Sequence, residues 1–235
     1  MKSRRALAGV DGCKGGWVAV VESGGAVQAF VVSSVTELVS KLNSDSLIAI
    51  DIPIGLTDSG ARLCDVAARR FLKAPRASSV FPAPIRPILG AETYEDASRI
   101  HREADGKGIS KQAFAIYPKI REVDYLLRSL PELQTRIREV HPEVSFAFWN
   151  DGRSLVAGKH STEGAEEREG LINSVWPGVQ AELSLRLPRS TVKRDDLNDA
   201  FAALWTATRI ADGTSVTLPK EPPLDSVGLR MEIVA

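Results

Sequence analysis

The stretch ALAGVDGCKGGWVAVV, residues 6–21, specifies the centre of the fold. Two apolar runs, residues 6–10 and 17–21, flank a short glycine-rich turn, and the first run ends in Asp11. Glycine-bearing turns of this length join neighbouring antiparallel strands. The stretch therefore predicts a β-hairpin that carries an aspartate at the end of its first strand.

The residues that follow extend this hairpin into a mixed sheet. A third strand is expected over residues 27–32, and residues 35–42 have the apolar spacing of one helical face. Because this helix carries the chain back across the sheet, the all-apolar strand 47–50 should lie parallel to the first strand. We expect an α/β fold with a three-strand antiparallel meander plus parallel strands, flanked by helices.

The remaining sequence is expected to complete one domain over residues 1–235. Residues 55–131 are too long for a simple connection, and they predict a mostly helical insertion that covers one end of the sheet. The other expected elements are strand character over residues 135–148, helices over 163–174 and 195–211, and an edge strand over 228–234.

The composition is that of an ordinary globular protein. The 30 basic and 30 acidic residues balance, so an anionic partner would have to be held by a local patch. Cys13 and Cys64 form no paired spacing of a zinc site or disulfide framework, which favours a reducing compartment. The charged start, residues 1–5, precedes an apolar run that Gly9 and Asp11 interrupt. We therefore expect a cytoplasmic protein with no signal peptide and no membrane span.

Two aspartates follow predicted buried strands in the same way. Asp11 comes after Gly9-Val10, and Asp51 comes after Ala49-Ile50. Ligands bind at the C-terminal edge of parallel strands, and neighbouring strands lie about 4.8 Å apart, so the two carboxylates could share one ion. Each aspartate could instead cap a turn or a helix. The pair together favours a binding site.

A second aspartate pair opens the predicted helix 195–211. Asp196 and Asp199 stand at positions i and i+3 and share one face, which Ala200, Ala203 and Ala207 extend. Small side chains on this face would let the helix approach the sheet closely. Aspartates in a first turn also stabilise the helix dipole, but a simple cap does not require Asp199. Because carboxylate oxygens suit Mg²⁺ or Mn²⁺, the sequence predicts a metal site of four residues: Asp11, Asp51, Asp196 and Asp199.

Two further groups of residues are candidates for the site. If residues 139–143 form a strand, Glu139, His141 and Glu143 share one face, and a histidine beside a carboxylate could move protons. The alternative is a solvated strand face. A run without acidic residues carries five cations that could contact phosphates: Arg69, Arg70, Lys73, Arg76 and Arg86.

Aromatic and basic neighbours extend this second group. Phe71 and Phe81 could stack on bases, and Lys119 and Arg121 could line the same cleft. The alternative for the helical part of the run is an amphipathic helix whose cations face water.

Several blocks of sequence resemble one uncharacterised family. They are GVDGCKGGW (9–17), AIDIPIG (49–55), SVFPAP (79–84), YPKIREVD (117–124), HPE (141–143) and DDLNDA (195–200). These blocks are similar to domain-of-unknown-function family 429, described as predicted nucleases of the ribonuclease H fold. The layout of the aspartates also resembles that of the Holliday-junction resolvases, in which a late helix supplies an aspartate pair.

The resemblance implies a ribonuclease H-like fold and a divalent-metal-dependent nuclease or phosphodiesterase that acts on nucleic acid. In such a site Asp11 would bridge two ions about 3.5–4 Å apart, which activate water and stabilise the leaving oxygen. The resemblance also favours a role for His141 and Glu143 beside the metals.

Two other functions compete with this one. Residues 11–16, DGCKGG, also resemble the phosphate loop of sugar kinases and actin-like ATPases. Those proteins carry two copies of a related fold, and 235 residues leave no room for a second copy. The other alternative is a non-catalytic scaffold or binding module, because a fold alone does not determine a function.

Overall fold

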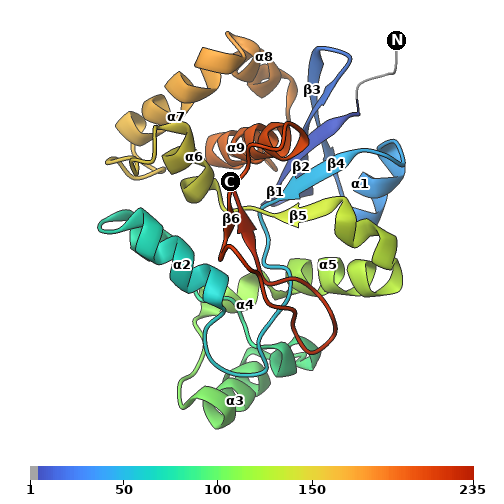
Figure 1. The fold of residues 1–235 in the computed structure, drawn as a ribbon, viewed down its shortest axis with the longest axis vertical. Helices are drawn as coiled ribbons and strands as arrows, with labels where there is room; N and C mark the ends of the chain where they lie inside the picture. The colour runs from blue at the N-terminus through green and yellow to red at the C-terminus, as the bar shows by residue number, and fades with distance from the viewer. Residues whose placement is uncertain (1–4) are drawn as a thin grey trace.

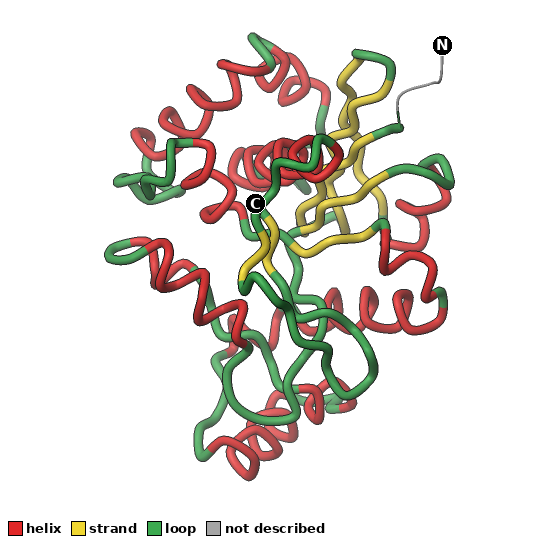
Figure 2. Tube along the Cα trace, viewed as in Figure 1, coloured by secondary structure: helices red, strands yellow, loops and turns green. Residues whose placement is uncertain are grey.

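The computed structural model describes residues 5–235, and residues 1–4 of the charged start lie outside the described residues. The strands gather in the upper part of the view in Figure 2, whereas the lower part is helix and loop. Figure 1 shows helices on both sides of the main sheet. Within residues 5–235, no helix is long and apolar enough to cross a membrane.

The main sheet has five strands in the order β3-β2-β1-β4-β5. Strands β1 (Leu7–Cys13), β2 (Gly16–Ser23) and β3 (Ala26–Val32) form the antiparallel meander. Strand β4 (Leu47–Ile50) runs parallel to β1, and β5 (Ile137–Glu139) runs parallel to β4. The predicted mixed sheet is therefore confirmed, with α1 (Val35–Lys41) as the connection between β3 and β4.

One face of the sheet is covered by the last helix, α9 (Arg194–Ala211). The close approach depends on Gly9, because a Cβ there would lie 2.0 Å from Leu204 N and 2.1 Å from Ala200 O. Ala203 packs in the same apolar cluster as Ala49 of β4. The small-residue face of α9 is thus the face that contacts the sheet.

The opposite face is covered by α1 and by α5 (Tyr117–Ser129), whose apolar side chains share a core with those of β1 and β4. Residues 55–131 otherwise contain short helical elements. These are α2 (Leu63–Leu72), η1 (Arg76–Ser79), η2 (Arg86–Gly90), α3 (Tyr94–Asp105) and α4 (Lys111–Ala115).

The expectation of strand character over residues 135–148 is wrong beyond β5. After the short turn η3 (Pro131–Thr135) and β5, the chain enters helix α6 (Pro142–Trp149). Proline is favoured at the first helical position, because its φ angle suits a helix and its missing N–H would be unpaired there anyway. Pro142 therefore starts a helix where the alternation of residue types suggested a strand.

The C-terminal part of the chain is helical, followed by a small separate sheet. Helices α7 (Thr162–Val175) and α8 (Val179–Arg186) precede α9, and α7 matches the expected helix. The expected edge strand is reduced to β7 (Ile233–Val234), which pairs with β6 (Thr217–Leu218).

Candidate metal centre

Asp11 and Asp51 lie at the same level on neighbouring parallel strands. Val10 is paired with Ile50 in the sheet register, and the backbone N–H of Asp51 donates to Val10 O at 2.9 Å. The two carboxyl groups influence each other's pKa: the charge of Asp51 raises the pKa of Asp11, and hydrogen bonding with Asp11 lowers that of Asp51. The sheet edge thus brings together the two strand aspartates that the sequence singled out.

Helix α9 adds Asp199 to this pair. Gly9 of β1 faces Ala200 and Leu204 of α9. Asp11 stands two positions after Gly9 and therefore points to the same face of the sheet. Asp199, which precedes Ala200, is thus brought near Asp11. Asp199 is 2% exposed and Asp11 is 8% exposed. Two of the three carboxyl groups are therefore buried, and that of Asp51 is half-buried.

Burial and mutual repulsion disfavour the charged forms of these acids. Burial, followed by the charges of Asp51 and Asp199, raises the pKa of Asp11 well above its ordinary value. Burial and then the charge of Asp199 raise the pKa of Asp51 to about 8. Burial also raises the pKa of Asp199. A cation placed among these groups would relieve the repulsion.

Lys159, in the loop between α6 and α7, supplies such a cation. Its Nζ lies 2.8 Å from Asp199 Oδ2 and 4.0 Å from Asp195 Oδ2. Burial lowers the pKa of Lys159, but attraction to Asp199, Asp11 and Asp51 outweighs this effect and raises it overall. Lys159 belongs to no motif, so the sequence offered no signal for its position.

Asp196 lies at the edge of the cluster and has a capping role. Its Oδ2 accepts a hydrogen bond from Lys193 N at 2.8 Å, which gives a partner to the backbone N–H of the residue that precedes α9. Burial raises the pKa of Asp196. Its influence on Asp11 is electrostatic and smaller than that of Asp51 and Asp199.

The donor set suits a hard divalent ion. Asp199 Oδ1 is buried and has no hydrogen-bond partner among the described residues. A buried oxygen of this kind costs free energy unless a partner satisfies it. The three aspartates offer only oxygen ligands, which Mg²⁺ and Mn²⁺ prefer.

The aspartates are nevertheless less tightly gathered than the ligands of a bound ion. Within residues 5–235, one group of three potential ligands has all its ligand atoms within 4.8 Å of one another: Cys64, Asp65 and Glu139. A guanidinium already fills that group, because Arg62 Nη2 donates to both carboxylates at 2.6 Å. Shared coordination by Asp11, Asp51 and Asp199 would require movement of their side chains.

The expected strand face of Glu139, His141 and Glu143 does not exist, because α6 begins at Pro142. Glu139 is bound to Arg62, and the buried Glu143 forms an ion pair with Arg168. His141 precedes α6 instead of sharing a strand face with Glu143.

His141 connects the end of β5 with the turn η1. Its Nε2 lies 3.3 Å from Ser79 O, and its Nδ1 is buried without a partner among the described residues. Burial lowers the pKa of His141, which favours the neutral imidazole.

The basic run 69–86 divides into two parts. Arg76 lies beside the loop that carries Lys159: its Nη1 is 3.8 Å from the position that a Cβ on Gly158 would occupy. Arg86 differs from the expectation: it forms ion pairs with Asp124, at 2.8 Å, and with Asp225. A guanidinium that is paired with two carboxylates inside the protein is not free to contact a phosphate. Arg86 is therefore no longer a candidate for substrate binding.

The remaining cations and aromatics of the prediction are also placed. Arg70 is exposed, and Arg69 Nε donates to Val80 O at 2.9 Å. Phe71 stacks on Phe148 with ring centroids 4.2 Å apart, whereas Phe81 is 67% exposed. Phe81 is therefore the aromatic of this segment that is free to contact a ligand.

Lys119, from α5, lies over the end of β1. Its Nζ donates to Gly16 O at 2.7 Å and lies 4.9 Å from the centroid of the Trp17 ring. The aliphatic part of the Lys119 side chain passes over Gly12, where a Cβ would lie 2.9 Å from Lys119 Cδ. The side chain is thus held across the end of β1.

A sequence model of one protein family, described as "Protein of unknown function (DUF429)", matches residues 9–224. The matched part includes the whole main sheet from Gly9 onward and all of α9. No curated protein and no solved structure matches the chain.

Proposed function

Since the chain belongs to the DUF429 family of proteins of unknown function, its site must indicate its activity, and we propose a divalent-metal-dependent hydrolase that cleaves phosphodiester bonds in nucleic acid. One observation carries this proposal. The buried carboxylates of Asp11 and Asp199 and the half-buried carboxylate of Asp51 converge at the C-terminal edge of the sheet, and Asp199 Oδ1 has no partner among the described residues.

Asp11, Asp51 and Asp199 would hold Mg²⁺ or Mn²⁺, with Asp196 at the margin. When bound, the ion would lower the pKa of a bound water and stabilise charge on the leaving oxygen. The chain holds these ligands on two strands and one helix, which are rigid elements. Such a scaffold keeps the acids near one another despite their repulsion.

The surrounding side chains have separate tasks. Arg76 lies beside the loop of Lys159 and Lys119 lies over the end of β1, and each could donate to phosphate oxygens. The neutral imidazole of His141 can accept a proton. The Glu143–Arg168 ion pair lies close enough to influence the charge of Asp199, and it fixes α6 against α7.

The arrangement of strands supports the ribonuclease H-like comparison made from the sequence. The sheet combines a three-strand meander with two parallel strands, and the acids come from β1, β4 and the last helix. This is the combination that the resemblance implies.

One observation favours the non-catalytic alternative. Lys159 neutralises part of the acidic cluster by itself, so a metal is not needed to stabilise the fold. In a scaffold or binding module, the Lys159–Asp199 ion pair would be permanent and divalent ions would have no effect.

Hydrolysis of two substrates tests the proposal: bis(p-nitrophenyl) phosphate and end-labelled nucleic acid. Activity should require Mg²⁺ or Mn²⁺, disappear with a chelator, and fall to background in Asp11→Asn and Asp51→Asn. Asp212→Asn is a matched control, because Asp212 is exposed at the far end of α9. Equal activity in all variants, or none with either ion, would favour the scaffold.

A further inference from the structure

A group of basic side chains surrounds the turn between β1 and β2. Lys14 lies in the turn, and its backbone N–H donates to Thr191 O at 3.1 Å. A Cβ on Gly15 would lie 3.0 Å from Thr191 Cβ, so the loop before α9 packs against this turn. We call the basic residues of the turn, this loop and the neighbouring α5 the hairpin patch: Lys14, Lys119, Arg189 and Lys193.

The hairpin patch carries four basic side chains. Among residues 5–235, none of the four forms an ion pair. Nearby arginines behave differently, since Arg186 pairs with Glu182 and Arg194 pairs with Glu169. An open groove of about 570 Å³ between α8 and α9 begins beside Arg189 and Lys193. The hairpin patch thus combines uncompensated charge with an accessible surface.

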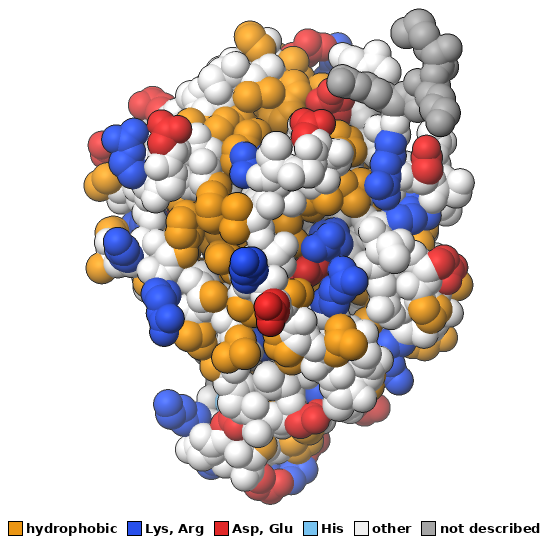
Figure 3. All heavy atoms as spheres, viewed as in Figure 1, with side chains coloured by type: hydrophobic (Ala, Val, Ile, Leu, Met, Phe, Trp, Pro, Cys, Tyr) orange, Lys and Arg blue, Asp and Glu red, His pale blue; other side chains and the backbone are white. Residues whose placement is uncertain are grey.

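A second unpaired basic group lies on the other side of the carboxylates. We call it the α2 patch: Arg69, Arg70, Lys73 and Arg76. Figure 3 shows basic side chains at the edge of the molecule over α2. Within the described part of the chain, none of these four forms an ion pair with an acid. The exposed ring of Phe81 follows η1 on the same side.

The two patches lie at opposite ends of one sheet edge. Along this edge the strands follow the order β2-β1-β4-β5. The hairpin patch is at the β1–β2 turn, Asp11 lies near the end of β1 and Asp51 directly after β4. His141 links the end of β5 to Ser79 of η1. Three strand intervals of about 4.8 Å separate the ends by about 14 Å.

The distance between the two ends of this edge favours a polymeric substrate over a small one. A nucleic-acid strand carries one phosphate per about 3.4 Å of helix axis, so about four phosphates would cover the edge. A small phosphodiester cannot contact both patches at once.

We propose that the substrate is a nucleic-acid strand that lies along this edge, with its backbone held by the hairpin patch on one side and the α2 patch on the other. Phe81 stacks on a base beside the α2 patch. This inference rests on the proposed function and adds the length and path of the substrate.

Binding of labelled single-stranded DNA and RNA, from about 2 to about 16 nucleotides long, tests the path by fluorescence anisotropy with Ca²⁺ present. Affinity should rise steeply up to about four nucleotides. Two double variants test the patches: Lys14→Ala/Lys193→Ala and Arg69→Ala/Arg70→Ala. Each should weaken binding of the longest oligonucleotide at least about tenfold. Each should also reduce the slope of log K against log salt concentration by about 1.4, because two phosphate contacts are lost. Phe81→Ala should weaken it by about tenfold.

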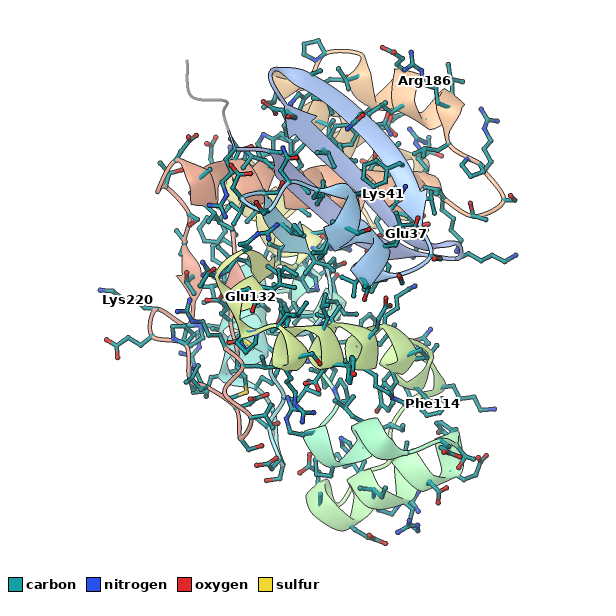
Figure 4. All side chains as sticks on the ribbon, turned by 90° about the vertical axis from the view of Figure 1, so that its right-hand side faces the viewer. Glu37, Lys41, Phe114, Glu132, Arg186 and Lys220 are labelled. Carbon is teal, nitrogen blue, oxygen red and sulfur yellow. The ribbon has the colours of Figure 1, made fainter. Side chains whose placement is uncertain are left out.

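A double variant of remote cations, Lys41→Ala/Lys220→Ala, is the matched control and should bind like the parent. Figure 4 shows Lys220 projecting outward from the molecule and Lys41 near Glu37 on α1. Circular dichroism melting should confirm that all variants fold.

Hydrolysis of bis(p-nitrophenyl) phosphate separates the two proposals. If the hairpin variant keeps this activity but loses oligonucleotide binding, the path is supported. If it binds oligonucleotides like the parent, the hairpin patch is an ordinary solvated surface and the inference is wrong. If the parent protein binds oligonucleotides through both patches but hydrolyses nothing, the proposed function fails while the binding path stands.

Discussion

Lys159 Nζ lies 2.8 Å from Asp199 Oδ2, so a side chain from the loop between α6 and α7 places a positive charge among the acids of β1, β4 and α9. The position that suits a divalent ion is therefore already partly neutralised. An ion that enters must compete with this ammonium group, because two cations this close repel.

Replacement of Lys159 by methionine should increase the affinity for Mn²⁺ about tenfold or more, because the competing charge is removed. Without metal, the variant should lose about 1–3 kcal/mol of unfolding free energy, less than for a fully buried pair because Lys159 is 37% exposed on its side chain. Calorimetric titration and denaturant unfolding measure the two effects. Lys220→Met, at an exposed remote site, is the control.

Asp11→Asn should abolish the stabilisation by divalent ions while leaving the metal-free protein as stable as the parent or more stable. The reason is that a neutral amide at this position removes a charge that burial, and then repulsion by Asp51 and Asp199, disfavours, and it also removes a ligand. Melting temperatures with and without Mn²⁺ test this expectation. A metal response as large as that of the parent would exclude Asp11 from the site.

The metal-free protein should lose stability as the pH rises from about 4 to 8. The pKa of Asp51 is raised to about 8 in the folded state, so the native protein holds a proton that the unfolded chain releases near its ordinary value of 3.8. The native state binds more protons in this window, and unfolding free energy therefore falls with pH. Glu139, whose pKa burial raises to about 7, acts in the same direction.

Urea unfolding at several pH values would measure this slope, and Asp51→Asn should make it shallower. Saturating Mn²⁺ should reverse the trend, because the ion binds the deprotonated acids. A stability that rises with pH in the metal-free parent between about pH 5 and 8 would contradict the assignment.

Gly9→Ala should disrupt both the fold and the site. The new methyl group would collide with the backbone of α9 at Leu204 and Ala200, and α9 would move away with Asp199. We expect a loss of about 1–3 kcal/mol, as for other overpacked cores, and weaker Mn²⁺ binding. Gly170→Ala is the control, because nothing lies within 4 Å of a Cβ there and alanine favours the helix α7. It should stabilise the protein slightly.

Arg62→Ala should cost about 3–5 kcal/mol of unfolding free energy. The substitution leaves Asp65 and Glu139 buried without their cation, and it removes the hydrogen bonds from Arg62 to Ile54 O and Gly55 O. Thermal and denaturant unfolding measure the loss. A double variant with Glu139→Gln should recover part of it, since one uncompensated charge disappears.

The elements with local signals could be predicted from the sequence. Alternating and continuous apolar runs around two glycine turns specify the meander, and the all-apolar strand 47–50 specifies a central parallel strand. Since Asp11 lies near the end of β1 and Asp51 directly follows β4, their meeting at one edge follows from the topology. The spacing of Asp199, Ala203 and Ala207 on one helix face similarly predicted which side of α9 contacts the sheet.

The pairing of charges, by contrast, is visible only in the folded chain. Lys159 meets Asp199 across 40 residues, and Arg86 is withdrawn into ion pairs with Asp124 and Asp225. At His141 a proline one residue later converts an apparent strand into a helix start. Secondary structure follows from periodic patterns over a few neighbouring residues, whereas the partner of a buried charge depends on segments that become neighbours only after the chain folds. Desolvation then makes that partner decisive, because a buried charge without one is costly.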